Sequence, residues 1–175
     1  MQKKTFIFFT VLLLLQISVK AQKGSFSLGL GPSSALAIID SKNFKAQFKP
    51  GFGAGISALY NTSDKSSLVL RVNYLSMAPK SANLLTLKWT AIKLGYRTYF
   101  NNSNVFVFGE GGLNIFSSKN SSSNTSFGLG AGLGYSISVG KSSSIDIAPS
   151  YDLLLSNPIN SNWLGLNIAY RIKFK

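Results

Sequence analysis

A two-residue alternation runs without interruption through Trp163–Phe174, next to the C-terminal lysine. Every second residue from Leu164 to Phe174 is apolar or aromatic, and the residues between them are small, polar or cationic. Successive side chains of a β-strand point to opposite faces, so this alternation predicts a strand with one wholly apolar face. In a soluble sheet a second protein layer would cover that face. The alternative is that lipid covers it.

The N-terminal segment is predicted to be removed during export. Lys3 and Lys4 precede a nearly continuous apolar run, Thr5–Leu15, and Ala21 offers a small residue at the expected cleavage point. This order is typical of a secretory signal peptide. A membrane anchor is the alternative, but a spanning helix needs about 20 apolar residues, and Lys20 ends this run too early. We therefore expect residues 1–21 to be a cleaved signal peptide.

The charge of the remaining chain is strongly positive. Cleavage removes three of the 18 basic residues and none of the five acids, which leaves a net charge of +10. Such an excess suggests polyanionic neighbours, such as the phosphates of lipid headgroups and lipopolysaccharide. Export argues against nucleic acid as a partner, and the chain lacks the dense basic cluster with interleaved aromatics that a nucleic-acid groove needs.

Seven further stretches alternate like the C-terminal one, and no stretch from residue 24 onward has convincing helical periodicity. The expected strands are Ser25–Ala37, Gly51–Tyr60, Ser67–Met77, Trp89–Phe100, Val105–Phe116, Thr125–Val139, Ser144–Leu155 and Trp163–Phe174. In the fifth stretch the alternation places Phe106 and Phe108 on the polar face, and the glycines at 109, 111 and 112 leave room for a β-bulge.

The connections are predicted to alternate in length. Three are tight and polar, at 61–66, 101–104 and 140–143, and four are mostly longer, at 38–50, 78–88, 117–124 and 156–162. An even-stranded meander with short turns at one end and longer loops at the other is typical of a transmembrane β-barrel. Tilted strands of this length cover the roughly 25 Å apolar band of an outer membrane. We therefore predict an all-β fold, an eight-stranded antiparallel up-and-down transmembrane barrel formed by residues 22–175.

The sidedness of the barrel follows from its charged residues and glycines. The ionisable residues inside strands all lie opposite the apolar stripe: Arg71, Lys93, Arg97, Glu110, Asp146, Asp152, Arg171 and Lys173. Most strand glycines share that face. The lumen of an eight-stranded barrel is narrow, so long cationic side chains fit only beside small neighbours. We expect the three acids to pair with Arg71, Lys93, Arg97 and Arg171 inside the barrel, because buried charges need partners.

Aromatic residues near the strand ends suggest two girdles at the membrane interfaces, although β propensity also favours aromatics. The proposed members are Phe52, Trp89, Phe127 and Trp163 at the long-loop end and Tyr60, Phe100, Tyr170 and Phe174 at the short-turn end.

The available chemistry argues against an enzyme. The chain has no histidine and no cysteine, which removes the usual metal sites, thiol nucleophiles and histidine acid–base catalysis. No GxSxG motif is present either. We therefore predict no catalytic residue, no metal and no cofactor. The long loops instead carry six lysines and one acid, Asp40, and such a cationic rim is suited to a phosphate-rich surface or an anionic partner. The lysines are Lys42, Lys45, Lys49, Lys80, Lys88 and Lys119.

The signal sequence ending at Ala21, the eight amphipathic strands and the closing alternation of Tyr170, Ile172 and Phe174 resemble the small outer-membrane β-barrel family of Gram-negative bacteria. The resemblance is to OmpX-like and OmpA-type transmembrane barrels and to PorT-like barrels of Bacteroidota. It implies a location in the cell outer membrane. It also implies that Tyr170, Ile172 and Phe174 form a signal for the outer-membrane assembly machinery.

Members of this family include adhesins, closed or narrow pores, envelope-stabilising proteins and secretion accessories, so the fold alone does not select a function. Our leading hypothesis is a monomeric, non-enzymatic barrel with a closed, polar, side-chain-filled lumen and basic loops that contact lipopolysaccharide or a partner. The alternatives are a narrow pore, a secretion accessory barrel, a lipid-modifying enzyme and a secreted lipocalin-like ligand carrier.

Overall fold

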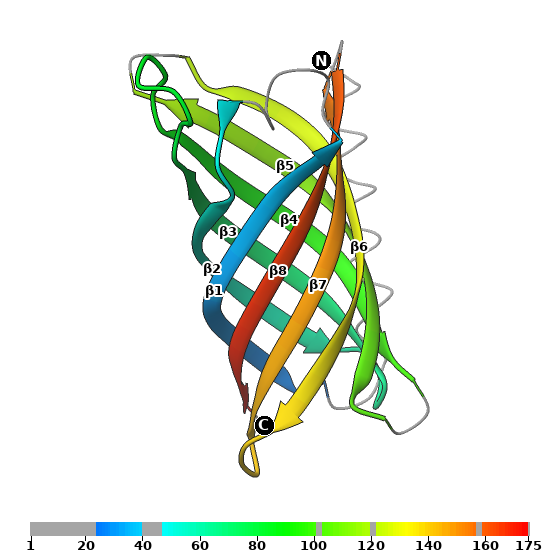
Figure 1. Cartoon of the computed structure of the whole chain (residues 1–175). Helices are drawn as coiled ribbons and strands as arrows, with labels where there is room; N and C mark the ends of the chain where they lie inside the picture. Colours follow the sequence, from blue (N-terminus) through cyan, green and yellow to red (C-terminus); the bar gives the residue numbers. More distant parts are fainter. Residues whose placement is uncertain (1–23, 40–46, 101–102, 120–121, 157–158, 175) are drawn as a thin grey trace, which may run out of the picture.

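The structure, a computed structural model, describes residues 24–39, 47–100, 103–119, 122–156 and 159–174. Over these ranges the chain is an antiparallel up-and-down barrel, closed by pairing of its first and last strands (Figure 1), as predicted. The strands are β1 Phe26–Ile39, β2 Gly51–Asn61, β3 Ser66–Met77, β4 Leu87–Tyr99, β5 Val105–Ser118, β6 Asn124–Ser138, β7 Ser143–Ser156 and β8 Ile159–Phe174. The expected signal peptide lies outside the described residues.

The last strand begins earlier than its apolar pattern predicts. β7 ends at Ser156 and β8 begins at Ile159, so the predicted start at Trp163 and the predicted loop at 156–162 are wrong. The backbone ladder continues through polar positions, with Leu154 opposite Ser161 and Leu153 opposite Asn162. The inward-facing Leu154 and Ser161 are 3% and 7% exposed. The ladder extends past Trp163 because strand pairing uses backbone groups and does not require an apolar side chain at each outward position.

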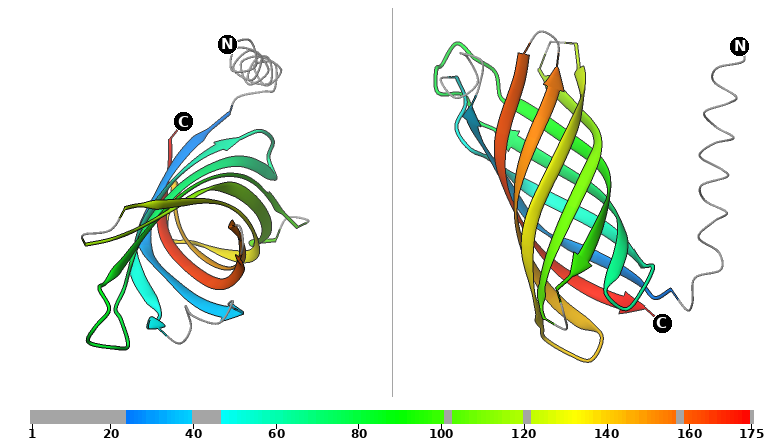
Figure 2. Two further views of the ribbon diagram at one scale, coloured as in Figure 1. Left: turned by 90° about the horizontal axis from the view of Figure 1, so that it is seen from above. Right: turned by 90° about the vertical axis from the view of Figure 1, so that its right-hand side faces the viewer.

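The two ends of the barrel differ in their connections (Figures 1 and 2). The longest connections, 40–50 and 78–86, lie at one end, which we call the long-loop end. At the same end, connection 119–123 is as long as the opposite turn 100–104, and connection 157–158 is shorter than all three opposite turns, so the predicted alternation of lengths holds only for the first two loops. The turns 62–65, 100–104 and 139–142 define the short-turn end, where β1 begins and β8 ends.

The two long connections are joined to each other by backbone contacts. Lys49 N donates to Ala78 O over 2.9 Å, and Lys80 N donates to Gln47 O over 2.7 Å. Between these two bonds, Phe48 pairs with Pro79 in an antiparallel bridge. The described part of the first loop is therefore fixed to the second.

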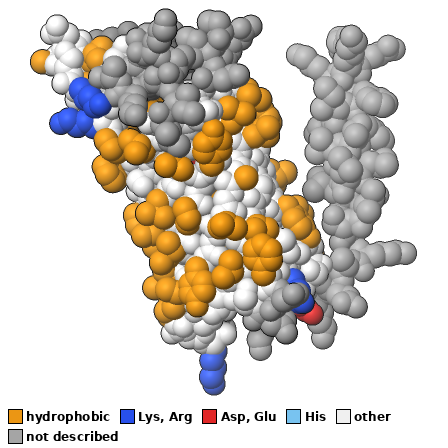
Figure 3. All heavy atoms as spheres, turned by 45° about the vertical axis from the view of Figure 1, so that its right-hand side comes forward, with side chains coloured by type: hydrophobic (Ala, Val, Ile, Leu, Met, Phe, Trp, Pro, Cys, Tyr) orange, Lys and Arg blue, Asp and Glu red, His pale blue; other side chains and the backbone are white. Residues whose placement is uncertain are grey.

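The outer wall of the barrel is apolar. Leu30, Leu94 and Leu133 are 62%, 62% and 57% exposed, and similar side chains cover the wall seen in Figure 3, with the Lys, Arg, Asp and Glu side chains visible there lying near its ends. The charged residues well inside the strands point inward, whereas Lys88 at the start of β4 and Lys173 at the end of β8 are exposed. This is the predicted sidedness and the reverse of a lipocalin, whose apolar residues face a central ligand. Within the described ranges, no helix is both long and apolar enough to cross a membrane.

Two members of the predicted aromatic girdles are misplaced. Phe52, Phe127, Tyr60, Phe100, Tyr170 and Phe174 are exposed on the outer wall, but Trp89 and Trp163 are only 2% exposed and lie inside the barrel. Their girdle assignment is therefore wrong. Both tryptophans are an even number of residues from an inward-facing neighbour on their own strand, Lys93 and Gly165 respectively, and alternation places them on the same face.

Inside the barrel, phenylalanine rings from β5 occupy the space that glycines on β6 leave free. Phe106 and Phe108 are 1% and 6% exposed and lie opposite Gly134 and Gly132. A Cβ atom at Gly132 would lie 2.6 Å from the Phe108 ring, which is too close for any side chain. β5 pairs with both neighbours without a register shift, so the glycines at 109, 111 and 112 form no bulge.

Candidate functional site

The interior of the barrel is arranged in three layers along its axis. The layer nearest the long-loop end is apolar, and we call it the aromatic plug; its buried side chains include Leu75, Met77, Trp89, Leu154 and Trp163. The ring centroid of Trp89 lies 5.1 Å from that of Trp163 and 5.4 Å from that of Phe116. Phe48, from the tethered long loop, packs against the same cluster. The expectation of a wholly polar lumen is therefore wrong at this end.

The second layer is a charge-balanced group near the middle of the strands, which we call the central cluster. Lys93 Nζ lies 3.1 Å from Glu110 Oε1 and also pairs with Asp152. Arg71 Nη1 lies 3.2 Å from the other Glu110 oxygen. Lys93, Glu110 and Asp152 are each less than a tenth exposed. Two cations and two carboxylates from β3, β4, β5 and β7 thus neutralise one another inside the barrel.

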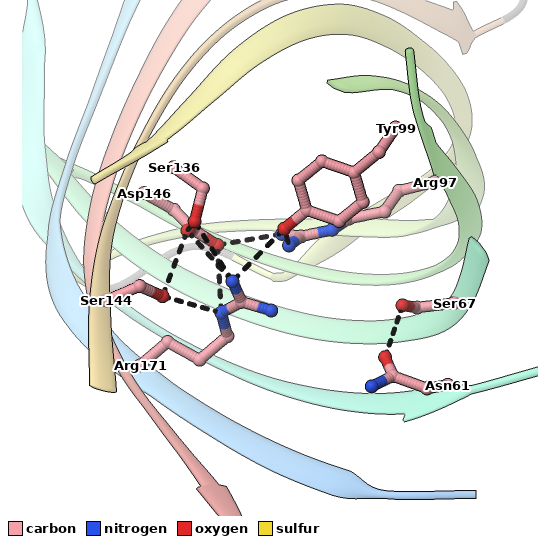
Figure 4. A network of polar contacts seen from close by, with 8 residues as sticks. All are labelled: Asn61, Ser67, Arg97, Tyr99, Ser136, Ser144, Asp146 and Arg171. Atoms are coloured by element: carbon pink, nitrogen blue, oxygen red, sulfur yellow. Dashed lines mark hydrogen bonds and ion pairs between the residues drawn. The ribbon is translucent and has the colours of Figure 1, made fainter. Parts of the chain in front are cut away.

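The third layer lies nearest the short-turn end, and we call it the lower cluster (Figure 4). Arg97 Nη1 lies 2.7 Å from Asp146 Oδ2, and Arg171 Nε lies 3.3 Å from the same oxygen. Ser136 donates to Asp146 over 2.7 Å, and both guanidinium groups donate to the Tyr99 hydroxyl. Two cations therefore share one carboxylate here.

The structure brings all seven predicted interior charges into these two clusters. The guanidinium of Arg97 also lies over the Phe106 ring, with 4.1 Å from Cζ to the centroid, so an aromatic side chain that the alternation placed on the polar face serves as a partner for a cation. Alternation did not indicate which acid meets which base, because it assigns each side chain to a face of its strand and leaves the register between strands open.

Four of the predicted basic loop residues are described, and they lie at the long-loop end. Lys49, Lys80, Lys88 and Lys119 are exposed there, whereas Lys42 and Lys45 lie outside the described residues. The residues predicted to form an assembly signal, Tyr170, Ile172 and Phe174, are 49%, 43% and 45% exposed on the outer face of β8. In the described part of the chain, no group of acidic residues could hold a metal ion.

Cavities occur at three levels of the barrel. A cavity of about 30 Å³ lies between the two charged clusters, beside Arg71, Arg97 and Asp146. Larger cavities of about 240 Å³ and 230 Å³ lie at the long-loop end and the short-turn end. The smallest of these three cavities therefore lies at the level of the charged layers.

An apolar wall around charged, internally paired side chains, in a closed antiparallel meander, defines an integral membrane β-barrel. The chain belongs to the outer membrane protein beta-barrel domain family, whose pattern matches residues 9–171. It is therefore an outer-membrane protein. No curated protein matches its sequence.

Several solved outer-membrane barrels have similar structures. Neisserial surface protein A is 20% identical, with a TM-score of 0.61 over 87% of this chain and 100% of that one. Ail, the attachment invasion locus protein of Yersinia pestis, was solved in complex with the heparin analogue sucrose octasulfate; it is 19% identical, with a TM-score of 0.60 over 86% and 100% of the two chains. OprG from Pseudomonas aeruginosa is 15% identical, with a TM-score of 0.58 over 87% and 96%. Identities this low show the fold alone.

Proposed function

We propose that this outer-membrane barrel is a non-enzymatic surface protein whose basic long-loop end binds polyanionic saccharide, with lipopolysaccharide as its principal partner. The observation that carries the proposal is the charge at that end. Of the residues described there, the charged ones are all lysines, Lys49, Lys80, Lys88 and Lys119, and all four are exposed.

The orientation of the barrel supports this partner. Outer-membrane barrels have short periplasmic turns and longer extracellular loops, so the end with connections 40–50 and 78–86 faces outward. There the lysines meet the phosphates of the outer leaflet, and ammonium groups form charge-assisted hydrogen bonds with phosphate oxygens. Lys88 lies on β4 close to the outer rim, which suits contact with a headgroup.

A sulfated sugar bound to Ail shows that one barrel of this fold interacts with a polyanionic saccharide. At 19% identity the likeness extends to the fold, so the proposal for this chain depends on its own lysines.

We also propose that the lumen does not conduct ions. The aromatic plug and the two charge clusters fill three successive levels, and the cavity between the clusters is only about 30 Å³. A narrow pore and a secretion accessory barrel are the competing functions. Planar-bilayer recordings decide between a closed lumen and a pore, because a closed barrel gives no single-channel steps and a pore gives steps that scale with salt concentration.

The absence of histidine and cysteine from the sequence supports a non-enzymatic role without a cofactor. A lipid-modifying enzyme would change lipid A, so unchanged lipid A after deletion of the gene supports the proposal. We further propose that the protein is a monomer. We also propose that the assembly machinery recognises the alternating apolar side chains Tyr170, Ile172 and Phe174 of β8 during insertion.

The binding proposal is tested with the purified barrel in a zwitterionic detergent. Replacing Lys49, Lys80, Lys88 and Lys119 together with glutamine is expected to weaken binding to lipopolysaccharide and to sucrose octasulfate and to reduce its dependence on salt. The charge-matched comparison is between Lys49→Gln/Lys119→Gln at the long-loop end and Lys65→Gln/Lys141→Gln, whose lysines are exposed at the opposite end. Equal loss of binding in these two double variants would show that total charge, and not the long-loop end, is responsible.

A further inference from the structure

A vestibule of about 230 Å³ opens at the short-turn end, between the lower cluster and the turns 62–65 and 139–142. Tyr99, Ser144 and Arg171 line its inner part. A single water occupies about 30 Å³ of liquid, so the vestibule has room for a solute group together with several waters. It lies at the opposite end of the barrel from the basic loops.

The lining of this vestibule is cationic. Its charged residues are Asp64 and four cations, Lys65, Lys141, Arg171 and Lys173. Among the described residues, no ion pair joins any of the three lysines to an acid. A concave site lined by one sign of charge, with low-dielectric walls, concentrates counter-ions.

Arg171 is the innermost cation and has unused donor capacity. Its Nε bonds Ser144 over 3.1 Å, and its Nη2 bonds Tyr99 and Ser136 over 3.1 and 3.0 Å (Figure 4). Its Nη1 donates to none of the described residues. The side chain is 15% exposed, so it is held rigidly while remaining reachable from the vestibule.

The lower cluster also carries more positive than negative charge. Asp146 is already paired with Arg97 at 2.7 Å, and Arg171 approaches the same carboxylate at 3.3 Å. The central cluster has as many carboxylates as cations, so the interior excess of charge is concentrated next to the vestibule. An anion placed there would complete the neutralisation of two closely spaced guanidinium groups.

We propose that this vestibule is a periplasm-facing binding site for a phosphate group, held by Arg171 Nη1 and by the ammonium groups of Lys65, Lys141 and Lys173. The phosphate belongs either to a soluble periplasmic ester or to an inner-leaflet lipid headgroup. Guanidinium suits this task because its fixed donors match phosphate oxygens. The site is independent of saccharide binding at the long-loop end.

The first test titrates inorganic phosphate into the isotopically labelled barrel in zwitterionic micelles and follows the amide signals of Tyr99 and Ser144 by NMR. Arg171→Gln leaves a one-to-one pair of Arg97 with Asp146, so this variant is expected to fold. We expect it to weaken phosphate binding about tenfold or more, as loss of a charged hydrogen bond does. Lys173→Gln, at an exposed position, is expected to weaken binding about 2- to 5-fold.

The control Lys49→Gln/Lys119→Gln, at the long-loop end, is expected to leave the phosphate-dependent shifts of Tyr99 and Ser144 unchanged, because these two residues line the vestibule and report on that site alone. The proposal is overturned if the wild type shows no phosphate-dependent shifts at Tyr99 and Ser144. It is also overturned if the wild type and the two single variants, Arg171→Gln and Lys173→Gln, all bind phosphate with equal affinity. Repeating the titration in nanodiscs distinguishes the sources. If anionic phospholipid occupies the site, it displaces inorganic phosphate; if it does not, the natural ligand is a soluble phosphate. Either result supports the site.

Discussion

Lys93 pairs with two carboxylates, and its replacement tests whether the interior charges stabilise the fold by neutralising one another. Lys93→Met keeps most of the side-chain length and removes the charge. Glu110 would retain Arg71 at 3.2 Å, but Asp152 would retain only the Ser150 hydroxyl at 3.1 Å among the contacts of the described residues. Removing one partner of a buried pair typically costs about 3–5 kcal/mol. We expect a loss of that size in the free energy of unfolding.

Two comparisons make this prediction specific. Adding Asp152→Asn to Lys93→Met removes the carboxylate charge that has lost its cation. The double variant is therefore expected to recover about 1–2 kcal/mol of the free energy of unfolding relative to the single one. Arg171→Gln leaves Asp146 paired with Arg97 at 2.7 Å, and we expect it to cost only about 1 kcal/mol.

The measurement is equilibrium denaturation of the barrel in lipid vesicles, monitored by tryptophan fluorescence, with gel migration of unheated samples as a check on folding. Trp89 and Trp163 are both buried in the aromatic plug, so unfolding changes their environment strongly. The reasoning would be refuted if Lys93→Met cost less than Arg171→Gln, or if Asp152→Asn made Lys93→Met worse.

Three further variants test the wall, the lumen and assembly. Leu133→Arg, in the apolar wall, is expected to cost about 2–4 kcal/mol in vesicle denaturation and Val139→Arg, at the short-turn end, about 0–1; equal costs would contradict the placement of the membrane. Gly134→Leu meets the Phe106 ring and is expected to cost about 1–3 kcal/mol, whereas Ala131→Leu on the outer face should be tolerated; the reverse order would contradict the sidedness. Phe174→Ser is expected to slow formation of the heat-modifiable folded form in cells more than Phe52→Ser, an exposed aromatic outside β8; equal rates would remove any special role for the last strand.

Alternation was sufficient to predict the eight strands and their faces, because a barrel in lipid imposes opposite environments on its two sides. It even placed Phe106 and Phe108 inside, where their size made the assignment look unfavourable. What it did not supply was their partners. The glycines that accommodate them lie on β6, and only the long-range register of β5 against β6 brings Phe106 opposite Gly134.

The error in the aromatic girdles arose because position along a strand was used in place of alternation. Trp89 and Trp163 were assigned to a membrane girdle because they lie near strand ends, although counting residues from Lys93 and Gly165 places them inside. The start of β8 was missed for a different reason. The backbone ladder does not require an apolar side chain at each outward position, so residues 159–162 carry no periodic signal that could be read from the sequence.

The seam between β1 and β8 makes a finished polypeptide a requirement for a stable product. Arg171, near the end of the last strand, completes the lower cluster, and Ser33 on the first strand bonds Asn167 over 2.8 Å. A chain broken off during synthesis before β8 would leave the backbone of β1 with an open edge and Asp146 with a single cation. Such fragments have no closed form to adopt in the membrane, so pairing of the last strand with the first commits only the whole polypeptide to a stable product.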